Sequence, residues 1–119
     1  MSSIFLAVGH GVSTDGSWDS GCTDGAYTEA DLMFSIAGFA VDMLRSHGVD
    51  VLTDHDTGND RNCTYTIRDA NAAGVDAYMS LHCDWNQAPS GTYPIVYPGS
   101  DQGAALANAV NASVMLALS

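Results

Sequence analysis

The stretch "SIFLAVGHG", residues 3–11, joins a short apolar run to a histidine between two glycines. The run is apolar and partly β-branched and ends at Gly9, a pattern typical of a strand buried on both faces of a sheet. Gly9 and Gly11 allow a sharp backbone turn that leaves the His10 imidazole accessible. The stretch therefore predicts a buried strand with a candidate functional histidine at its carboxyl end.

Strands and helices alternate along the rest of the chain. Apolar residues recur at helical spacing between Thr28, a suitable N-cap, and Gly48, a suitable helix end. The positions expected to form the apolar face of this helix are Leu32, Ile36, Phe39, Ala40, Met43 and Leu44. The other predicted elements are strands at 49–53, 76–82 and 91–98 and helices at 64–74 and 102–118. The strand at 91–98 is expected near a sheet edge, because Pro94 lacks an amide donor.

This alternation predicts an α/β fold with a mainly parallel, twisted sheet and helices on both faces. In such sheets ligands bind beyond the carboxyl ends of the strands, so we expect the ligand site at that edge. At 119 residues the chain has the length of one domain, 1–119, with one core.

Composition excludes several classes of function. The net charge is -11, with no lysine and only three arginines, so the chain repels polyanions and nucleic-acid binding is not expected. No stretch approaches the roughly 20 apolar residues of a membrane span, and residues 1–8 lack the basic start of a signal peptide. The three cysteines lack the close pairing of a zinc ribbon or redox motif, so we expect them to be reduced.

A candidate metal site follows from the strand ends. His10 follows the first strand, His82 ends the third, and Glu29, the only glutamate among 14 acidic residues, lies in the first turn of the long helix. Two histidines and one glutamate around an open position form a known zinc arrangement for hydrolytic chemistry. Alternatively, each histidine is only packed or hydrogen-bonded, and the glutamate only complements the helix dipole.

The other two histidines are excluded as ligands. His47 stands at the end of the long helix, where it is expected to cap the helix and complement its dipole. His55 lies in an acidic loop and is expected to be solvated.

These residues resemble the zinc-dependent N-acetylmuramoyl-L-alanine amidases of the Amidase_3 family. The resemblance runs nearly end to end and rests on ordered motifs instead of a single one. The matching segments are Ile4 to Val8, Gly9-His10-Gly11, Asp19-Ser20-Gly21-Cys22, Ala26-Tyr27-Thr28-Glu29, Gly48-Val49-Asp50-Val51, Arg68, Ala70-Asn71, Val75-Asp76, Ser80-Leu81-His82, Gly91 and Leu106-Ala107.

The resemblance implies that His10, Glu29 and His82 bind Zn2+. It also implies that the substrate is bacterial peptidoglycan and that the bond cleaved joins N-acetylmuramic acid to L-alanine. Such an enzyme acts at the cell wall as a lysin or autolysin, either secreted or released at phage lysis.

One departure concerns the catalytic base. Family members continue past the last helix into a strand that carries a catalytic glutamate, whereas this chain has no second glutamate. We therefore expect a fragment or a shortened domain, with Asp84 as the remaining candidate base, very slow or absent hydrolysis, and substrate-binding residues unassigned. A shortened sheet also predicts self-association through the C-terminal edge and the helix face of Leu106, Val110, Val114 and Leu118.

Two other functions compete with the amidase. The first is a zinc-retaining module that binds peptidoglycan without turnover. The second is a metal-free domain of the flavodoxin type, which requires a phosphate-cradling loop; Gly9-His10-Gly11 has too few glycines for one.

Overall fold

The computed structural model describes residues 2–57, 62–84, 91–92 and 94–118. The chain divides into two compact units, Met1–Asn86 and Gln87–Ser119, and each is described by itself. The expectation of one domain over 1–119 stays a prediction.

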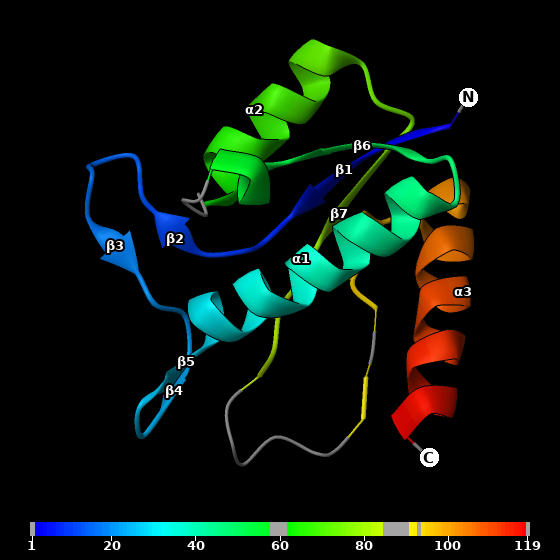
Figure 1. Ribbon diagram of the computed structural model, residues 1–119. Helices are drawn as coiled ribbons and strands as arrows, with labels where there is room; N and C mark the ends of the chain where they lie inside the picture. Colours follow the sequence, from blue (N-terminus) through cyan, green and yellow to red (C-terminus); the bar gives the residue numbers. More distant parts are fainter. Residues whose placement is uncertain (1, 58–61, 85–90, 93, 119) are drawn as a thin grey trace. The chain divides into compact units, whose positions relative to one another are not determined.

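The first unit is built on a parallel three-stranded sheet. Strand β1 (Ser3–Ala7) lies between β6 (Asp50–Thr53) and β7 (Ala77–Ser80) (Figure 1). Ile4 pairs with Val51 on one side and with Ala77 on the other. The predicted α/β class is confirmed, and the strand expected at 76–82 is shorter, ending before His82.

Helices cover both faces of this sheet, as predicted. Helix α1 (Glu29–Ser46) lies on one face and α2 (Cys63–Ala73) on the other (Figure 1). The side chains of β1 alternate between them. Ile4 and Leu6 pack with α1, whereas Phe5 and Ala7 pack with α2. The first cluster contains Ile4, Leu6, Val41 and Val51, and the second contains Phe5, Ala7 and Ala70.

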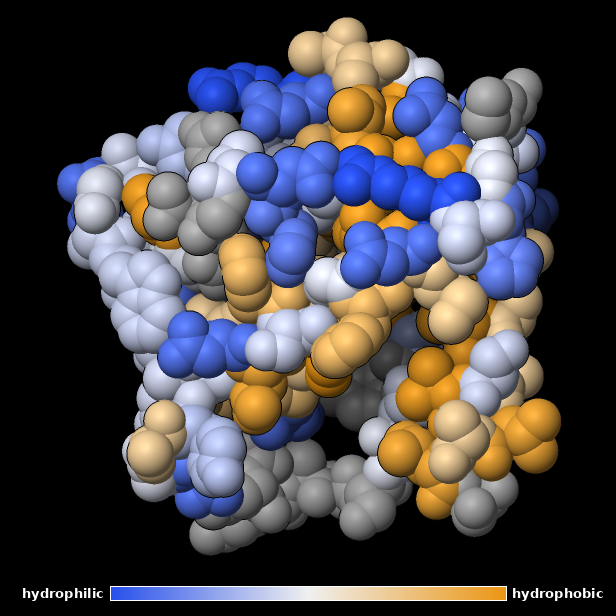
Figure 2. Space-filling view, viewed as in Figure 1, coloured by the Kyte–Doolittle hydropathy of each residue, from blue (hydrophilic) through white to orange (hydrophobic). Residues whose placement is uncertain are grey.

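The buried face of α1 differs from the predicted one. Ala30, Met33, Ala37 and Val41 are buried, whereas four of the expected core positions are exposed, with Phe39 at 79% of its surface. Those four are Leu32, Ile36, Phe39 and Met43. Figure 2 shows apolar side chains exposed over α1. Ala40 and Leu44, also predicted, pack partly against the first cluster.

Small side chains explain this choice of face. A fully buried Ala30 and Ala37 let the backbone of α1 approach the sheet closely, which larger side chains would prevent. The helix carries two apolar stripes of the same period, so periodicity alone did not distinguish them. The predicted cap is confirmed, since the Thr28 hydroxyl accepts the Asp31 N–H at 3.1 Å.

The loop before α1 contains two short hairpins that the sequence did not predict. One pairs β2 (Gly11–Val12) with β3 (Trp18–Asp19), and the other pairs β4 (Thr23–Asp24) with β5 (Tyr27–Thr28). Strands of two residues are too short to show a period. A 3-10 turn at Asp54–Thr57 follows β6, in the segment predicted as a loop.

The second unit contains the predicted last helix, α3 (Asp101–Leu118). The strand expected at 91–98 is wrong for the described part of that range, because residues 91–92 and 94–98 form no strand. Pro94 and Pro98 supply no amide donors, which removes two ladder hydrogen bonds from so short a segment. Ile95 is 87% exposed, which also differs from a sheet position. Within the described ranges, no helix combines the length and apolar character needed to cross a membrane.

Candidate metal centre

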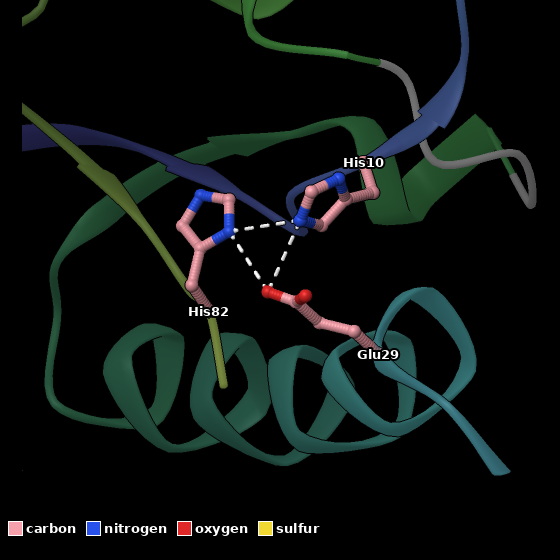
Figure 3. A group of neighbouring side chains, drawn as sticks. All are labelled: His10, Glu29 and His82. Carbon is pink, nitrogen blue, oxygen red and sulfur yellow. Dashed lines mark hydrogen bonds and ion pairs between the residues drawn. The ribbon is translucent and has the colours of Figure 1, made fainter. Parts of the chain in front are cut away.

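The structure brings His10, Glu29 and His82 together at the carboxyl edge of the sheet. Glu29 Oε1 lies 3.1 Å from His10 Nε2 and 3.0 Å from His82 Nδ1 (Figure 3). The two ring nitrogens are 3.3 Å apart. The three side chains come from the turn after β1, the first residue of α1 and the segment after β7, so the predicted convergence is confirmed.

The glycine turn gives His10 its position. Gly9, His10 and Gly11 have φ values of 87°, 57° and 91°, so three consecutive residues adopt the left-handed region. For a non-glycine residue this conformation costs about 1–2 kcal/mol, which the surrounding contacts must offset. A side chain at Gly9 would overlap the Leu81 carbonyl oxygen, so glycine lets β1 approach the chain just before His82.

Backbone amides hold the Glu29 carboxylate. Cys22 donates its N–H to Oε2 at 3.0 Å, and Cys83 donates its N–H to Oε1 at 3.1 Å. The residue is only 3% exposed. Burial alone raises the pKa of this carboxyl, but the two amides and the neighbouring histidines outweigh it and hold the pKa below its ordinary value. Glu29 is therefore a fixed, buried anion.

Each histidine has a second partner on its other ring nitrogen. His10 Nδ1 lies 2.9 Å from Asp19 Oδ2, and His82 Nε2 lies 2.9 Å from Ser80 Oγ. Asp19 and Ser80 lie within the family motifs of the sequence, but no role was predicted for either residue. The signal for Ser80 was its i, i+2 spacing from His82 along an extended segment. The contact between Asp19 and His10 depends on the β2–β3 hairpin, which the sequence did not predict.

Charge at the site favours a cation. Burial of the His10 imidazole opposes its protonation, but Asp19 and Glu29 outweigh burial and raise the pKa of His10 above 6.5. The hydrogen bond from His10 holds the pKa of Asp19 below its ordinary value. The shift of His10 reflects the negative potential of the two carboxylates around its ring, and the shift of Asp19 reflects the hydrogen bond that His10 donates to it.

The three converging atoms fit a zinc ion. If His10 Nδ1 carries the proton given to Asp19, Nε2 presents a lone pair to a carboxylate oxygen, and two acceptors repel unless a proton or metal lies between them. Ligand atoms about 2.0–2.1 Å from a tetrahedral zinc ion lie about 3.3 Å from one another. The observed separations of 3.0, 3.1 and 3.3 Å are close to that value. One imidazole is a quarter exposed and the other about half, which leaves an open side.

Comparison with known families agrees with this chemistry. The family Amidase_3, described as N-acetylmuramoyl-L-alanine amidase, matches residues 4–118. The chain belongs to this family. The resemblance seen in the motifs is thereby confirmed, and the enzyme class of this family member is N-acetylmuramoyl-L-alanine amidase, acting on peptidoglycan. Comparison with curated proteins gave no match.

A cavity of about 220 Å³ borders Glu29. It lies between the β4–β5 hairpin, the start of α1 and the segment after His82. Its lining residues are Cys22, Thr23, Asp24, Tyr27, Thr28, Glu29, Leu32, Cys83 and Asp84. Asp84 thus lies beside the candidate metal centre, on the same cavity as Glu29. All three cysteines, Cys22, Cys63 and Cys83, are free.

The remaining histidines lie outside the site. His47 is the C-cap of α1, with Nδ1 2.8 Å from the Met43 carbonyl oxygen, which confirms its predicted role. The prediction that His55 is solvated was wrong. Its ring stacks on Phe34 with centroids 4.2 Å apart and lies against Gly38, where a methyl group would come within 2.9 Å of Nε2.

Proposed function

We propose that this amidase hydrolyses the bond between N-acetylmuramic acid and L-alanine with a zinc ion held by His10 Nε2, Glu29 Oε1 and His82 Nδ1. The observation that carries the proposal is the convergence of these three atoms within 3.3 Å at the carboxyl edge of the sheet. Family membership supplies the reaction, and the donor set supplies the reason for a metal.

The protein's residues have distinct tasks in this proposal. A bound zinc ion supplies a Lewis acid that polarises the scissile carbonyl and makes a water molecule more acidic. Glu29 places a buried negative charge beside the two neutral imidazoles, and the amides of Cys22 and Cys83 keep it from rotating. The cavity beside Glu29 and Asp84 is where the substrate amide binds.

Asp84 is the proposed general base. The sequence has one glutamate, and that residue is assigned to the metal. Asp84 lines the cavity that Glu29 also lines, which supports this role. In the proposal its carboxylate takes a proton from the attacking water and passes it to the leaving amino group of L-alanine. Replacing Asp84 by asparagine is expected to lower kcat about 100- to 10,000-fold and to leave zinc binding intact.

The setting of the reaction follows from the substrate. The enzyme acts at the bacterial cell wall as a lysin or autolysin, and it binds neither nucleic acid nor membrane, consistent with a net charge of -11. Self-association through the C-terminal helix stays a prediction.

The product identifies the reaction directly. Purified cell walls are incubated with the zinc-loaded chain, and soluble products are examined by mass spectrometry for peptides with a free L-alanine amino group. We expect such peptides with the parent chain and none with Glu29→Gln. Cleavage between the sugars, or within the peptide, by the parent chain would refute the proposal.

A peptidoglycan-binding module without turnover is the second candidate. The observation that favours it is the single glutamate, because Glu29 is assigned to the metal and does not serve as a catalytic base. Zinc-dependent sedimentation of the chain with cell walls, together with no new alanine amino groups even after long incubation, would select this function over hydrolysis.

A further inference from the structure

The two imidazoles of the centre face it through different nitrogens. His10 presents Nε2 and His82 presents Nδ1, while the remaining nitrogens contact Asp19 and Ser80. We propose that Asp19 and Ser80 are positioning residues that hold the two histidines in opposite tautomers, so that a lone pair from each ring faces the metal. The inference rests on the proposed zinc site.

Asp19 is fixed from two directions. Its Oδ1 accepts the Gly21 N–H at 2.9 Å, and its Oδ2 lies 2.9 Å from His10 Nδ1. Because a carboxylate only accepts hydrogen bonds, His10 Nδ1 must carry the proton. A proton on Nδ1 leaves Nε2 of the neutral ring as the lone pair, and Nε2 is the atom 3.1 Å from Glu29 Oε1.

The loop gives Asp19 this position. In the β2–β3 hairpin, Asp19 pairs with Gly11, the residue next to His10. The Gly21 bond then turns the chain back toward Glu29, and a methyl group at Gly21 would lie 2.7 Å from His10 Cδ2. The hairpin and the turn therefore hold the carboxylate at the outer side of the imidazole.

Ser80 plays the matching part with a neutral group. Ser80 ends strand β7, which also contains Tyr78, and it precedes His82 by two residues. The three residues therefore lie along one side of an extended segment. The Ser80 hydroxyl also acts on the Tyr78 phenol, which lies 2.9 Å from Thr66 Oγ1. With its own proton directed to Tyr78, Ser80 Oγ accepts from His82 Nε2 and leaves Nδ1 as the lone pair.

The hydrogen bond from His10 to Asp19 should be stronger than the hydrogen bond from His82 to Ser80. A carboxylate accepts a stronger hydrogen bond than a hydroxyl and also makes the ring a better electron donor. Loss of Asp19 should therefore weaken zinc binding more than loss of Ser80. Removing an outer partner of a metal-ligating histidine typically costs 10- to 100-fold in metal affinity.

The first test reads the tautomers without metal or activity. Nitrogen-15 NMR of the metal-free parent chain at about pH 8.5 should show His10 protonated at Nδ1, the atom that faces Asp19. Asp19→Asn should move His10 toward the Nε2–H form, because one acceptor oxygen cannot serve both the Gly21 amide and His10, and the amide NH2 repels Nδ1–H.

The second test measures zinc affinity by competition with a chelator. Asp19→Asn is expected to bind about 10- to 100-fold more weakly than the parent, and Ser80→Ala by a smaller factor. Asp15→Asn is the matched control. It removes the same charge from an aspartate of the same loop that also accepts two hydrogen bonds, but from Ser17. It should bind zinc as the parent does.

The outcomes separate this inference from the proposed function. If the metal-free parent shows His10 protonated at Nε2, or if folded Asp19→Asn and Asp15→Asn bind zinc equally well, the positioning roles are wrong while the amidase proposal stands. If Asp19→Asn does not fold, the parent's tautomers and the affinity of Ser80→Ala still decide. Correct tautomers in a parent chain that binds no zinc would refute the metal centre and, with it, the positioning roles.

Discussion

Cys83 donates its backbone N–H to Glu29 Oε1 at 3.1 Å, and the same oxygen lies 3.0 Å from Nδ1 of the preceding residue, His82. The segment after β7 therefore supplies one candidate ligand and also fixes the orientation of another. Since Glu29 begins α1, this contact ties the helix start to the sheet edge.

Glu29→Gln tests this arrangement. The amide group of glutamine would have to face the N–H of Cys22 or Cys83, and two donors repel. We expect zinc affinity to fall by at least the 10- to 100-fold typical of a lost outer partner, and stability by about 1–3 kcal/mol.

The control for this variant is Asp31→Asn, which removes a charge from the same helical turn. It should change stability by only about 0.3–1 kcal/mol and leave zinc affinity unaltered. Chelator competition and urea unfolding measure both quantities. Equal zinc affinity in Glu29→Gln and the parent would mean that Glu29 only starts the helix.

Gly21→Ala should disturb the metal centre sterically. A methyl group there would lie 2.6 Å from Glu29 Oε2, at a backbone φ of 68°. Gly25→Ala is the matched control, because φ is 60° and nothing lies within 4 Å of the added methyl. Both variants should lose about 1–2 kcal/mol from backbone strain. Only Gly21→Ala should lose zinc affinity, and equal affinities would contradict the geometry.

The metal-free protein should be most stable between about pH 4.5 and 6.5. The pKa of Glu29 is depressed in the folded state, so its contribution is present above 4.5 and lost as pH falls through the lower folded value. The pKa of His10 is raised, so its contribution is present below 6.5 and lost as pH rises through the higher folded value. Urea unfolding across this range tests the prediction.

Bound zinc should offset the loss of stability that the metal-free protein shows above about pH 6.5. The proposed ligand His10 must lose a proton before Nε2 binds the ion, so zinc affinity should rise over the range where metal-free stability falls. Added zinc should therefore stabilise the protein more at pH 8 than at pH 6. A zinc effect independent of pH would argue against a histidine ligand.

Helix α1 provides a test of packing. Val41 is 2% exposed in the first core cluster, and we expect Val41→Ala to cost about 1.5–3 kcal/mol. Phe39→Ala, on the exposed stripe, should stay within about 0.5 kcal/mol of the parent. If thermal unfolding shows a larger loss of stability for Phe39→Ala than for Val41→Ala, the stripe predicted from the sequence, and not the observed one, faces the core.

The fold and the convergence of His10, Glu29 and His82 were largely predictable from local signals. A buried strand before Gly9, a capped helix after Thr28 and histidines at strand ends are properties of neighbouring residues, and a parallel sheet brings such ends together. The single glutamate could be placed because a helix start has a recognisable cap.

Features that depend on tertiary context were not predictable. Which apolar stripe of α1 faces the sheet depends on how closely Ala30 and Ala37 allow the helix to approach. His55 was expected in solvent because its neighbours in sequence are acidic, but Phe34, far along the chain, covers its ring. Asp19 reaches His10 through a hairpin whose two-residue strands carry no pattern.

Anomalous diffraction at the zinc absorption edge, from crystals grown with zinc, tests whether these three residues bind the metal. We expect one strong peak about 2.0–2.2 Å from His10 Nε2, Glu29 Oε1 and His82 Nδ1. No peak at these atoms, or a peak bound through His10 Nδ1 or His82 Nε2, would contradict this expectation.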